Sequence, residues 1–470
     1  MNINTPILWV LVPIFMALVT GTLFQRRTLS LILSISTALG LTLLAIFFPE
    51  DLTLSLGPFT ITFVERLAFL GRQITIVSEM LPLVALVYLA TTLWILSSWV
   101  TDTPEIFRPT SLVVSGLLTA ALGVQPFLYA ALLIQTAILA TIPALSHTQK
   151  RPSPGILRYL GLQTIAMPFI LIAGWLLTGI FTLPPDSPLV SQSMLVLGLG
   201  FALLLGVFPF HSWVPMISES SHPNVTSFLL FILPTTILTF GLNFFDRYAF
   251  LRTSQDVFQV LRMIGGLMVV LGGIWAAIQD DFKRAFGFAA LMETGFSLIA
   301  LGLAIQGGLN WLLMLFPARA MAYWLWGYTL SKFEVHLETL NLQTMQGFAR
   351  RFPFLSLGLV TAQFSIAGLP LLASSPVKTA LFTGILDVAP GLGIWVFVGN
   401  LGLFLFTFKA IASLVKPAEQ PMPQSWSKDE KLSDYLPALI IIVVIILMGL
   451  FPQIFLDPIR TTLTAFTQLQ

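Results

Sequence analysis

Two stretches decide the fold of this chain: FPFHSWVP at residues 208–215 and GLPLLASSPVK at residues 368–378. Each interrupts a long apolar segment, and the two interruptions lie at matching places in the two halves of the chain. The prolines Pro209, Pro215, Pro370 and Pro376 are expected to break a helix, because proline lacks the backbone N–H and clashes with the preceding turn. Broken helices at corresponding positions of two halves point to an ion or substrate path at the bilayer midplane.

The composition predicts a membrane protein. The chain is 56% hydrophobic and 9% charged, with a mean hydropathy of +0.90, whereas soluble domains carry about 25% charged residues. A spanning helix needs about 20 apolar residues, so the chain has room for about 14. We expect an all-α integral membrane protein with spans at 6–24, 29–48, 77–99, 110–124, 126–145, 155–181, 189–208, 224–243, 256–278, 285–306, 310–331, 353–388 (broken), 392–415 and 436–456.

Alternation of apolar and polar residues around Gly57-Pro58 predicts a hairpin at 52–63, lying on the membrane surface. The retained span at 6–24 has no positive n-region and no small-residue cleavage site, which argues against a signal peptide.

Basic residues predict the orientation of the chain. The loops after odd-numbered spans carry 14 of the 23 Lys and Arg residues, and the loops after even-numbered spans, with the C-terminal tail, carry 6. Loops rich in Lys and Arg face the cytoplasm, so we expect both termini on the non-cytoplasmic side. The larger set is Arg26, Arg27, Arg108, Lys150, Arg151, Arg158, Lys283, Arg284, Lys332, Arg350, Arg351, Lys416, Lys428 and Lys431.

Several classes of site are excluded or disfavoured. The chain has no cysteine, which excludes disulfides and iron–sulfur ligation by this chain. Its four histidines, His147, His211, His222 and His336, have no metal-ligand spacing. We expect no cofactor on this chain, no nucleotide site and no nucleic-acid partner, since there is no P-loop, dinucleotide fingerprint or basic cluster.

Charged residues inside spans are the candidate functional residues, because an intramembrane charge is costly. The three remaining basic residues, Arg319, Lys378 and Lys409, lie inside or near the ends of spans, and Glu293 is the clearest acidic candidate.

At these residues the chain resembles the antiporter-like subunits of respiratory complex I, NDH-1, Mrp cation/proton antiporters and membrane-bound hydrogenases. Residues 208–215, with Pro223 and Ser227, resemble the family pattern PxHxWxPDAxxxAPxxVSxxL. DFKRAFGF at 281–288 resembles DxKRxLAYS, and GFARRFP at 347–353 resembles GLxRRxP. IAGLP at 366–370 with Lys378 resembles LAGxPxxxGFxxK, and GLFP at 449–452 resembles a motif near the last span. No long lateral helix follows, so the chain resembles a divergent shorter member.

The resemblance implies two inverted five-helix repeats, each with a broken helix, in which ionisable residues relay protons. The expected parts are residues 1–109 (N-terminal helices and hairpin), 110–243 (first repeat, broken near 209–215), 256–415 (second repeat, broken near 370–376) and 416–470 (a loop and the last helix). It also implies other membrane subunits as partners in a bacterial inner or thylakoid-type membrane. Quinone, NAD(P)H or ferredoxin, and iron–sulfur clusters are expected on those partners.

The first half departs from the family pattern. Gln135 stands where the family has a Glu, and Leu204 stands where it has a Lys. One further departure lies in the second half, where Met321 is in the segment that matches the family's HAxxK, with Arg319 offset by two residues. Neither Gln nor Leu exchanges a proton at neutral pH, so the first half-channel is expected to lack the usual Glu–Lys switch.

The second half keeps Lys378, Glu293 and Arg319, which we take as the proton path together with His211. Each has a structural alternative: Lys378 as a cap for carbonyls freed at the break, Glu293 as a static partner of Arg319, and His211 as a brace for the broken helix. Two weaker candidates are Glu219, expected in an exposed loop, and Lys409, expected to reach the membrane surface.

Three functions fit this pattern. The first is a proton-translocating subunit of a complex I or NDH-1-type assembly, which holds no redox cofactor itself. The second is a component of an Mrp-type cation/proton antiporter or of an inorganic-carbon-uptake system. The third is a scaffold that has lost conduction, as Gln135, Leu204 and Met321 suggest.

Overall fold

The computed structural model describes residues 2–23, 25–48, 53–56, 59–69, 71–146, 153–178, 187–417 and 430–469. Parts of the sequence-based predictions lie outside these residues. They are the end of the first expected span at Phe24, the hairpin residues Leu52, Gly57 and Pro58, residues 179–181 of the sixth span, and His147, Lys150, Arg151 and Lys428.

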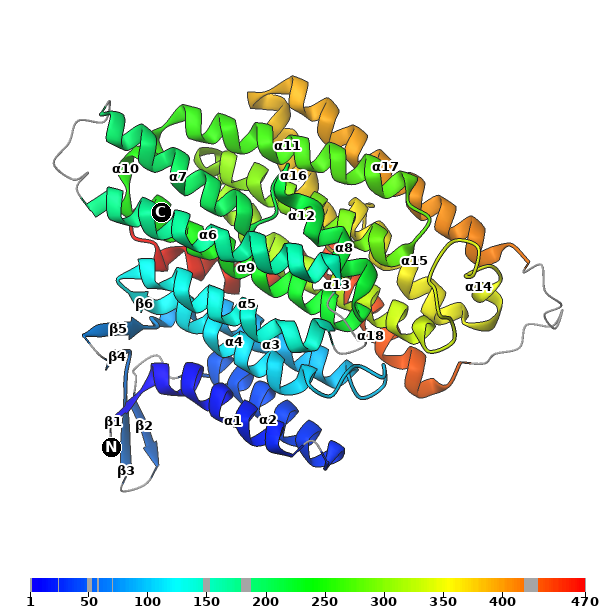
Figure 1. Cartoon of the computed structure of the whole chain (residues 1–470), viewed down its shortest axis with the longest axis horizontal. Helices are drawn as coiled ribbons and strands as arrows, with labels where there is room; N and C mark the ends of the chain where they lie inside the picture. The colour runs from blue at the N-terminus through cyan, green and yellow to red at the C-terminus, as the bar shows by residue number, and fades with distance from the viewer. Residues whose placement is uncertain are drawn as a thin grey trace.

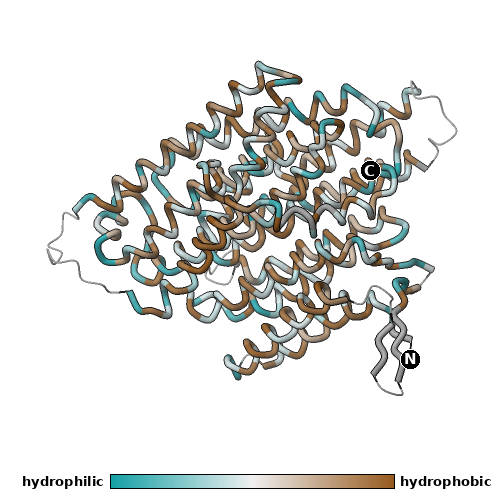
Figure 2. The backbone as a smooth tube through the Cα atoms, turned by 180° about the vertical axis from the view of Figure 1, so that it is seen from behind, coloured by the Kyte–Doolittle hydropathy of each residue, from teal (hydrophilic) through white to brown (hydrophobic). Residues whose placement is uncertain are grey.

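The chain folds into a bundle of long helices that run side by side (Figure 1). The N-terminal helices lie along one edge, and α11 and α17 lie along the other. Hydrophilic residues lie mainly where helices begin and end (Figure 2). Nine helices in the described part are long and apolar enough to cross a membrane, and three shorter apolar helices accompany them. The protein is therefore an integral, multi-pass membrane protein, while the count of fourteen spans stays a prediction.

The N-terminal part contains a π-helix and three α-helices. Their bounds are Ile7–Leu11 (η1), α1 Val12–Thr22, α2 Arg27–Ile46 and α3 Leu81–Ser97, with the short helix η2 (Ser78–Met80) before α3.

The next segment holds the first broken helix. Its helices are α4 Phe107–Gly123, η3 Phe127–Tyr129, α5 Ala130–Ser146, α6 Pro154–Thr178, α7 Pro188–Leu204, η5 Phe210–Ser212, α8 Trp213–Ser220, α9 Pro223–Arg247 and α10 Ala249–Thr253. The expected span 189–208 thus ends four residues early, because the backbone turns at Gly206, whose φ is +62°.

The remaining helices contain the second break. They are α11 Gln255–Ile278, α12 Phe282–Gly302, η6 Ala304–Gln306, α13 Gly308–Glu334, α14 Phe348–Arg351, α15 Pro353–Ala367, α16 Ser375–Val388, α17 Pro390–Val415, α18 Leu432–Leu450, α19 Pro452–Arg460 and η7 Thr461–Ala465.

Two small three-stranded sheets lie at one end of the bundle (Figure 1). The expected hairpin is present as an antiparallel pair, β2 (Thr53–Leu56) with β3 (Phe59–Val64), in which Leu56 faces Phe59. β1 (Asn2–Asn4) pairs in parallel with β3, and β4 (Arg66–Phe69), β5 (Arg72–Thr75) and β6 (Val124–Gln125) form the second sheet. The protein is therefore mostly helical, not purely so.

Small residues bring the helices of the second half close together. A Cβ atom placed on Gly273 of α11 would overlap the backbone of Gly399 on α17, and one on Gly265 would lie 2.6 Å from the carbonyl oxygen of Gly295 on α12. Helices in lipid associate through such close backbone approach. An 18-residue stretch of each of α9 and α12 is completely buried, so a charged side chain in that stretch of α12 is shielded from lipid.

Candidate functional site

Three charged side chains from α12, α13 and α16 meet in the interior of the bundle. The carboxylate of Glu293 lies 2.5 Å from the Lys378 Nζ through Oε1 and 3.3 Å from the Arg319 Nε through Oε2. The side chains of Glu293, Arg319 and Lys378 are 2%, 1% and 4% exposed. One carboxylate is therefore shared by two cations away from solvent, and the three residues are called the charged triad below.

Arg319 is fixed by more than its ion pair. Its Nη2 donates to the backbone oxygen of Glu293 at 2.8 Å and to the hydroxyl of Ser297 at 2.5 Å. Ser297 follows Glu293 by four residues on α12, so both present their groups on one face of the helix. Guanidinium stays protonated in proteins, and Arg319 is thus a permanent positive charge held in place by three contacts.

Lys378 has a different environment. Besides Glu293, its ammonium contacts the carbonyl oxygen of Ile366, in the last turn of α15, and lies 4.1 Å from the ring centroid of Phe296. The carbonyl contact is the cap considered as the structural alternative, and here it coexists with the ion pair to Glu293. An amine with three such partners is well positioned, and unlike a guanidinium it can release a proton.

The second break places Lys378. α15 ends at Ala367, and Gly368 follows with φ +82°, a left-handed conformation that glycine adopts without a steric cost. The Leu369 N–H bonds back to the oxygen of Phe364 and the Gly368 N–H to that of Ser365. A Cβ atom on Gly368 would lie 3.1 Å from the Lys378 Cδ, so the absence of a side chain here lets the lysine pass toward Glu293.

The four prolines do not share one role. Pro209 and Pro370 lie in the non-helical segments between α7 and α8 and between α15 and α16. Pro215 lies in the first turn of α8, and Pro376 in the first turn of α16. A proline in the first turn begins a helix at little cost, because its missing N–H has no intrahelical partner there. Two of the four predicted break residues thus start the following helix.

Among the described residues of 110–243, the positions expected to match the charged triad hold neutral side chains. The Gln135 Nε2 donates to the Thr164 hydroxyl at 2.9 Å, and Leu204 offers only its backbone oxygen, which accepts from the Gln163 Nε2 at 3.0 Å. Met321 is buried on α13, two residues beyond Arg319. Gln135 and Leu204 are therefore neutral groups in neutral contacts.

The remaining predicted residues lie apart from the triad. His211 stacks on Phe208 and on Trp275, with ring centroids 5.4 and 4.8 Å away. Glu219 lies on helix α8, not in a loop as expected, because α8 continues to Ser220, and it pairs at 3.7 Å with Arg284. Lys409 is exposed and donates to the Ala277 oxygen at 2.7 Å, at the end of α11. Within the described part, no contact joins these three to the triad.

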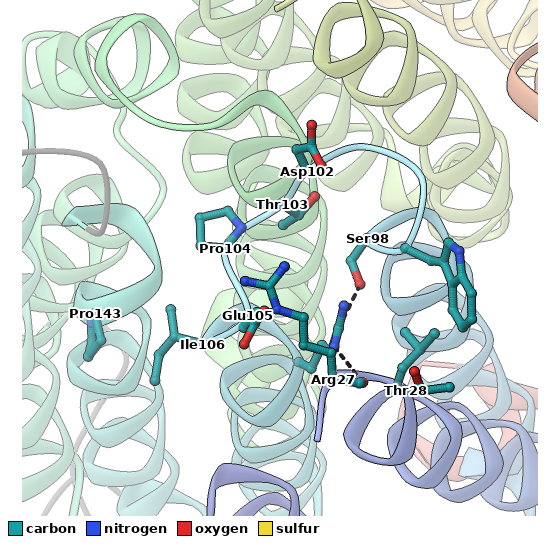
Figure 3. Close-up of a pocket in the computed structure, with 12 residues that line it drawn as sticks. Arg27, Thr28, Ser98, Asp102, Thr103, Pro104, Glu105, Ile106 and Pro143 are labelled. Carbon is teal, nitrogen blue, oxygen red and sulfur yellow. Dashed lines mark hydrogen bonds and ion pairs between the residues drawn. The ribbon is translucent and has the colours of Figure 1, made fainter. Parts of the chain in front are cut away.

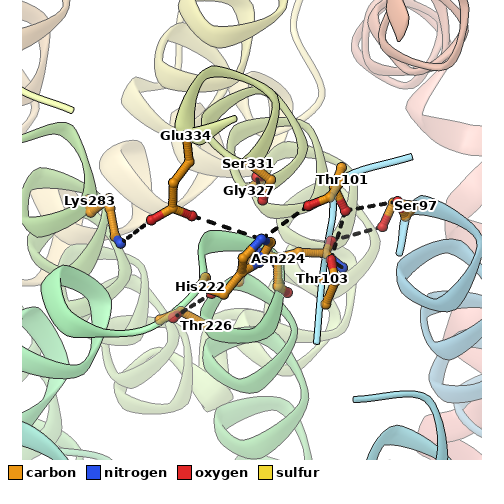
Figure 4. A network of polar contacts seen from close by, with 11 residues as sticks. Ser97, Thr101, Thr103, His222, Asn224, Thr226, Lys283, Gly327, Ser331 and Glu334 are labelled. Atoms are coloured by element: carbon orange, nitrogen blue, oxygen red, sulfur yellow. Dashed lines mark hydrogen bonds and ion pairs between the residues drawn. The ribbon is translucent and has the colours of Figure 1, made fainter. Parts of the chain in front are cut away.

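A second polar cluster, not predicted from the sequence, connects α9, α12 and α13 (Figure 4). The carboxylate of Glu334 lies between Lys283, at 2.8 Å, and His222, at 3.8 Å. His222 caps α9, since its Nδ1 accepts from the Asn224 N–H. Burial lowers the pKa of His222 to about 4, although Glu334 acts in the opposite direction. His222 is thus a neutral cap at neutral pH.

Sequence reasoning also missed the neighbours of the triad. Phe296 and Ser297 follow Glu293 by three and four residues on α12 and contact Lys378 and Arg319, respectively. Residues three and four positions after Glu293 lie on the same face of a helix, so this spacing could have identified Phe296 and Ser297 from the sequence. The described residues contain no group of three or more His, Asp or Glu that could hold a metal ion.

A buried charged triad beside a broken helix, in a bundle of membrane-spanning helices, is a candidate site for ion movement. Residues 176–403 match the family described as "NADH:quinone oxidoreductase/Mrp antiporter, TM". This match assigns residues 176–403, just under half of the chain, to that family of antiporter-like membrane subunits.

Relatives and solved structures agree with this assignment. NADH-quinone oxidoreductase subunit N 1 of Herpetosiphon aurantiacus is 24% identical over 287 residues, which are 57% of this chain and 56% of that protein. Subunit N of Pelagibacter ubique is 23% identical over 55% of this chain and 57% of its own. The chain thus spans about half the length of the curated relatives it matches.

Chains of two solved assemblies share the fold. One belongs to the Mrp complex from Dietzia sp., with a TM-score of 0.81, 15% identity and 99% of both chains covered. The other belongs to respiratory complex I from Thermus thermophilus with bound NADH, with a TM-score of 0.76, 18% identity and 99% of both chains covered.

Proposed function

We propose that this chain is a proton-translocating, antiporter-like membrane subunit of a complex I or NDH-1-type NAD(P)H (or ferredoxin):quinone oxidoreductase. In this proposal the charged triad relays the proton, and the first half-channel lacks the usual Glu–Lys switch. The chain carries no redox cofactor; quinone, NAD(P)H or ferredoxin and iron–sulfur clusters are bound by partner subunits.

The observation that carries the proposal is the single carboxylate shared by Lys378 and Arg319. With all three groups ionised, the triad has a net charge of +1, which is expensive to bury. Arg319 cannot lose its proton, so the excess charge is relieved when Lys378 releases one. Capture of a proton restores the pair with Glu293. Lys378 is thus the group that moves the proton, and Arg319 is the fixed charge that favours its release.

Comparison of the two proposed repeats, 110–243 and 256–415, supports a proton relay in the second repeat only. Counted from the start of each repeat, α5 corresponds to α12 and the broken helix α7–α8 to α15–α16. Gln135 on α5 thus corresponds in element to Glu293 on α12. Leu204 lies on the part of the first broken helix before its break, and Lys378 lies on the part of the second broken helix after its break. The second repeat carries the charged pair, and the first carries neutral residues.

Two other functions compete with this one. An Mrp-type cation/proton antiporter or an inorganic-carbon-uptake component is favoured by the likeness to the Mrp complex chain. A non-conducting scaffold is favoured by the neutral contacts of Gln135 and Leu204. In a scaffold, Lys378 would serve only as a cap and as an ion-pair partner of Glu293. An antiporter would need an ion gradient but no electron donor.

The proposed setting is a bacterial inner or thylakoid-type membrane, with other membrane subunits alongside and both chain termini on the non-cytoplasmic side. Purification from native membranes in mild detergent, followed by mass spectrometry of the accompanying subunits, tests this setting. Quinone-reductase and iron–sulfur subunits are the expected partners. Mrp-type or carbon-uptake partners alone would remove the redox part of the proposal.

Lys378→Arg tests the relay. Arginine keeps the positive charge, the pair with Glu293 and a donor for the Ile366 oxygen, but it does not release a proton. We expect assembly and electron transfer capacity to persist and proton uptake by inverted membrane vesicles to fall roughly ten- to a hundredfold. Proton uptake is followed with a pH-sensitive dye during substrate oxidation.

Lys409→Arg is the matched control, because Lys409 is exposed and lies outside the triad; its proton uptake is expected to be unchanged. Normal proton uptake by the Lys378→Arg variant would show that Lys378 is only a structural cap.

A further inference from the structure

A cavity of about 830 Å³ lies away from the charged triad, where α2 and α4 begin (Figure 3). Its lining comes from the first residues of α2, the segment between α3 and α4, the start of α4 and Pro143 near the end of α5. Ligand-binding pockets have volumes of about 300–1,000 Å³. The triad helices α12, α13 and α16 contribute no lining residue, so a ligand held here does not touch the triad.

The lining carries two positive and two negative side chains: Arg27, Arg108, Asp102 and Glu105. Arg27 forms an ion pair with Glu105, and its side chain is 80% exposed. Arg108 is 7% exposed; its Nη1 donates to the Arg27 oxygen at 3.0 Å and its Nε to the Ser98 hydroxyl at 3.4 Å. The Arg108 Nη2 makes no hydrogen bond to any residue of the described part of the chain, so a buried donor in the lining has capacity for a ligand.

Apolar side chains are exposed beside the cavity. α2 is one of the helices long and apolar enough to span the membrane, and Arg27 is its first residue. The cavity therefore lies at the level where a span meets the headgroups. Trp99 lines it and is 58% exposed, while Leu96 and Ile32, on the adjacent turns of α3 and α2, are also exposed. Exposed Trp at the end of a span is typical of the membrane interface.

We propose that this cavity binds the headgroup of an aminophospholipid such as phosphatidylethanolamine. Arg27 and Arg108 bind the phosphodiester, and Glu105 and Asp102 bind the ammonium group. A lining of zero net charge fits a zwitterion, because a purely anionic headgroup would be repelled by the two carboxylates. A trimethylammonium headgroup has no N–H to donate to them, so the primary amine is the group that is recognised.

Lipid retention tests the proposal. The full chain, purified with its accompanying subunits in mild detergent, is stripped of lipid, incubated with phosphatidylethanolamine, phosphatidylcholine or phosphatidylglycerol of identical acyl chains, and examined by native mass spectrometry. We expect phosphatidylethanolamine to be retained roughly tenfold better than either other lipid, which corresponds to about 1.4 kcal/mol. Soluble phosphoethanolamine is offered in a parallel sample and is not expected to bind without acyl chains.

Two variants locate the binding. Arg27→Gln is expected to lower retention of all three lipids, because it removes the exposed phosphate contact. Glu105→Gln is expected to abolish the preference for phosphatidylethanolamine over phosphatidylcholine. Arg158→Gln is the control, since Arg158 lies near the start of α6 and outside the cavity lining. A melting curve of each variant separates loss of lipid from loss of fold.

Four results would overturn the proposal: equal retention of the three lipids, stronger retention of phosphatidylglycerol, undiminished retention in Arg27→Gln with an unchanged lipid preference in Glu105→Gln, or binding of soluble phosphoethanolamine alone. Cross-linking of a cysteine at Trp99 to a neighbouring subunit in the intact assembly would also overturn it, since a protein segment would then fill the cavity.

Discussion

At the scale of single residues, Glu293 holds the interior of the second half together. Its carboxylate contacts Lys378 through one oxygen and Arg319 through the other, and its own backbone oxygen accepts from Arg319. Charges in a low-dielectric interior are stable only when they are paired and hydrogen-bonded. Removal of the carboxylate therefore affects two cations at once.

Glu293→Gln is expected to destabilise the protein by about 3–5 kcal/mol, because it leaves buried cations without a counter-charge. The measurement is the thermal unfolding midpoint in detergent. Glu219→Gln is the matched control: its pair with Arg284 is 3.7 Å long and both side chains are about half exposed, so a change of less than about 1 kcal/mol is expected. Equal midpoints for the two variants would mean that the triad is not an ionised unit.

His222 is expected to make the fold sensitive to acid. Its folded-state pKa of about 4 lies below the ordinary value of 6.5, because burial disfavours the charged ring. Between these values the unfolded chain binds more protons than the folded chain. Stability therefore falls as the pH drops from 6.5 toward 4, by about 2 kcal/mol at pH 5.

His222→Asn checks this expectation, because asparagine keeps an acceptor for the Asn224 N–H but does not titrate. The difference between the unfolding midpoints at pH 7 and pH 5 should be smaller in the variant than in the parent chain. An unchanged difference would assign the acid sensitivity to other groups.

The sequence identified the residues of the triad but not their arrangement. Lys378 follows from its spacing to Pro370, and Glu293 from its place in a span. That both cations share one carboxylate depends on the packing of α12, α13 and α16, which no local pattern encodes. The cluster around His222 was missed for the same reason, since His222, Lys283 and Glu334 are far apart in sequence.

At the scale of elements, both breaks use the same device. α7 and α15 are each followed by a glycine in the left-handed conformation, Gly206 and Gly368, before the chain turns into α8 and α16. The breaks were predicted from the prolines of the sequence. The end of α7 was misplaced by four residues, because glycine stops the helix before the proline is reached, whereas α15 ends at Ala367, directly before the interruption predicted at 368–378.

Gly368→Ala is expected to cost about 1–2 kcal/mol, since a Cβ atom is unfavourable in the left-handed region, and to lower proton uptake because the new atom crowds Lys378. Gly198→Ala on α7 is the control: nothing lies within 4 Å of its Cβ position, so it should be neutral or stabilising. Unfolding midpoints and vesicle proton uptake measure both effects. Full activity in Gly368→Ala would mean that the lysine does not need this opening.

The short strands show the limit of sequence patterns. The antiparallel hairpin of β2 and β3 was predicted from alternation around Gly57-Pro58, and the structure confirms its pairing. β6 has two residues and β1 three, too few for any periodicity. These strands form because residues distant in the chain meet at one end of the bundle.

At the scale of the whole molecule, the distribution of Lys and Arg among the loops predicts the orientation of the chain in the membrane. We expect the loop after α13 to face the cytoplasm and the segment between α10 and α11 to face the opposite side. Because the chain has no cysteine, a single introduced cysteine is the only residue of this chain that a thiol reagent labels.

Glu338→Cys, in the first of these loops, and Asp256→Cys, at the start of α11, are both exposed positions. In intact cells an impermeant maleimide should label Asp256→Cys, and in inverted vesicles it should label Glu338→Cys. The reverse pattern would place the termini in the cytoplasm.

The ion pair between Arg319 and Glu293 also affects which ion the triad can bind. A sodium ion needs several oxygen ligands, with carboxylates foremost among hard-cation ligands. The triad offers one carboxylate, and a permanent cation already occupies one of its oxygens. On the proposed mechanism the triad alternates between one positive charge and none as Lys378 gains and loses its proton. An alkali cation thus meets either repulsion or a ligand set too small to replace its water shell, and coupling through this centre is selective for protons by charge and not by pore size.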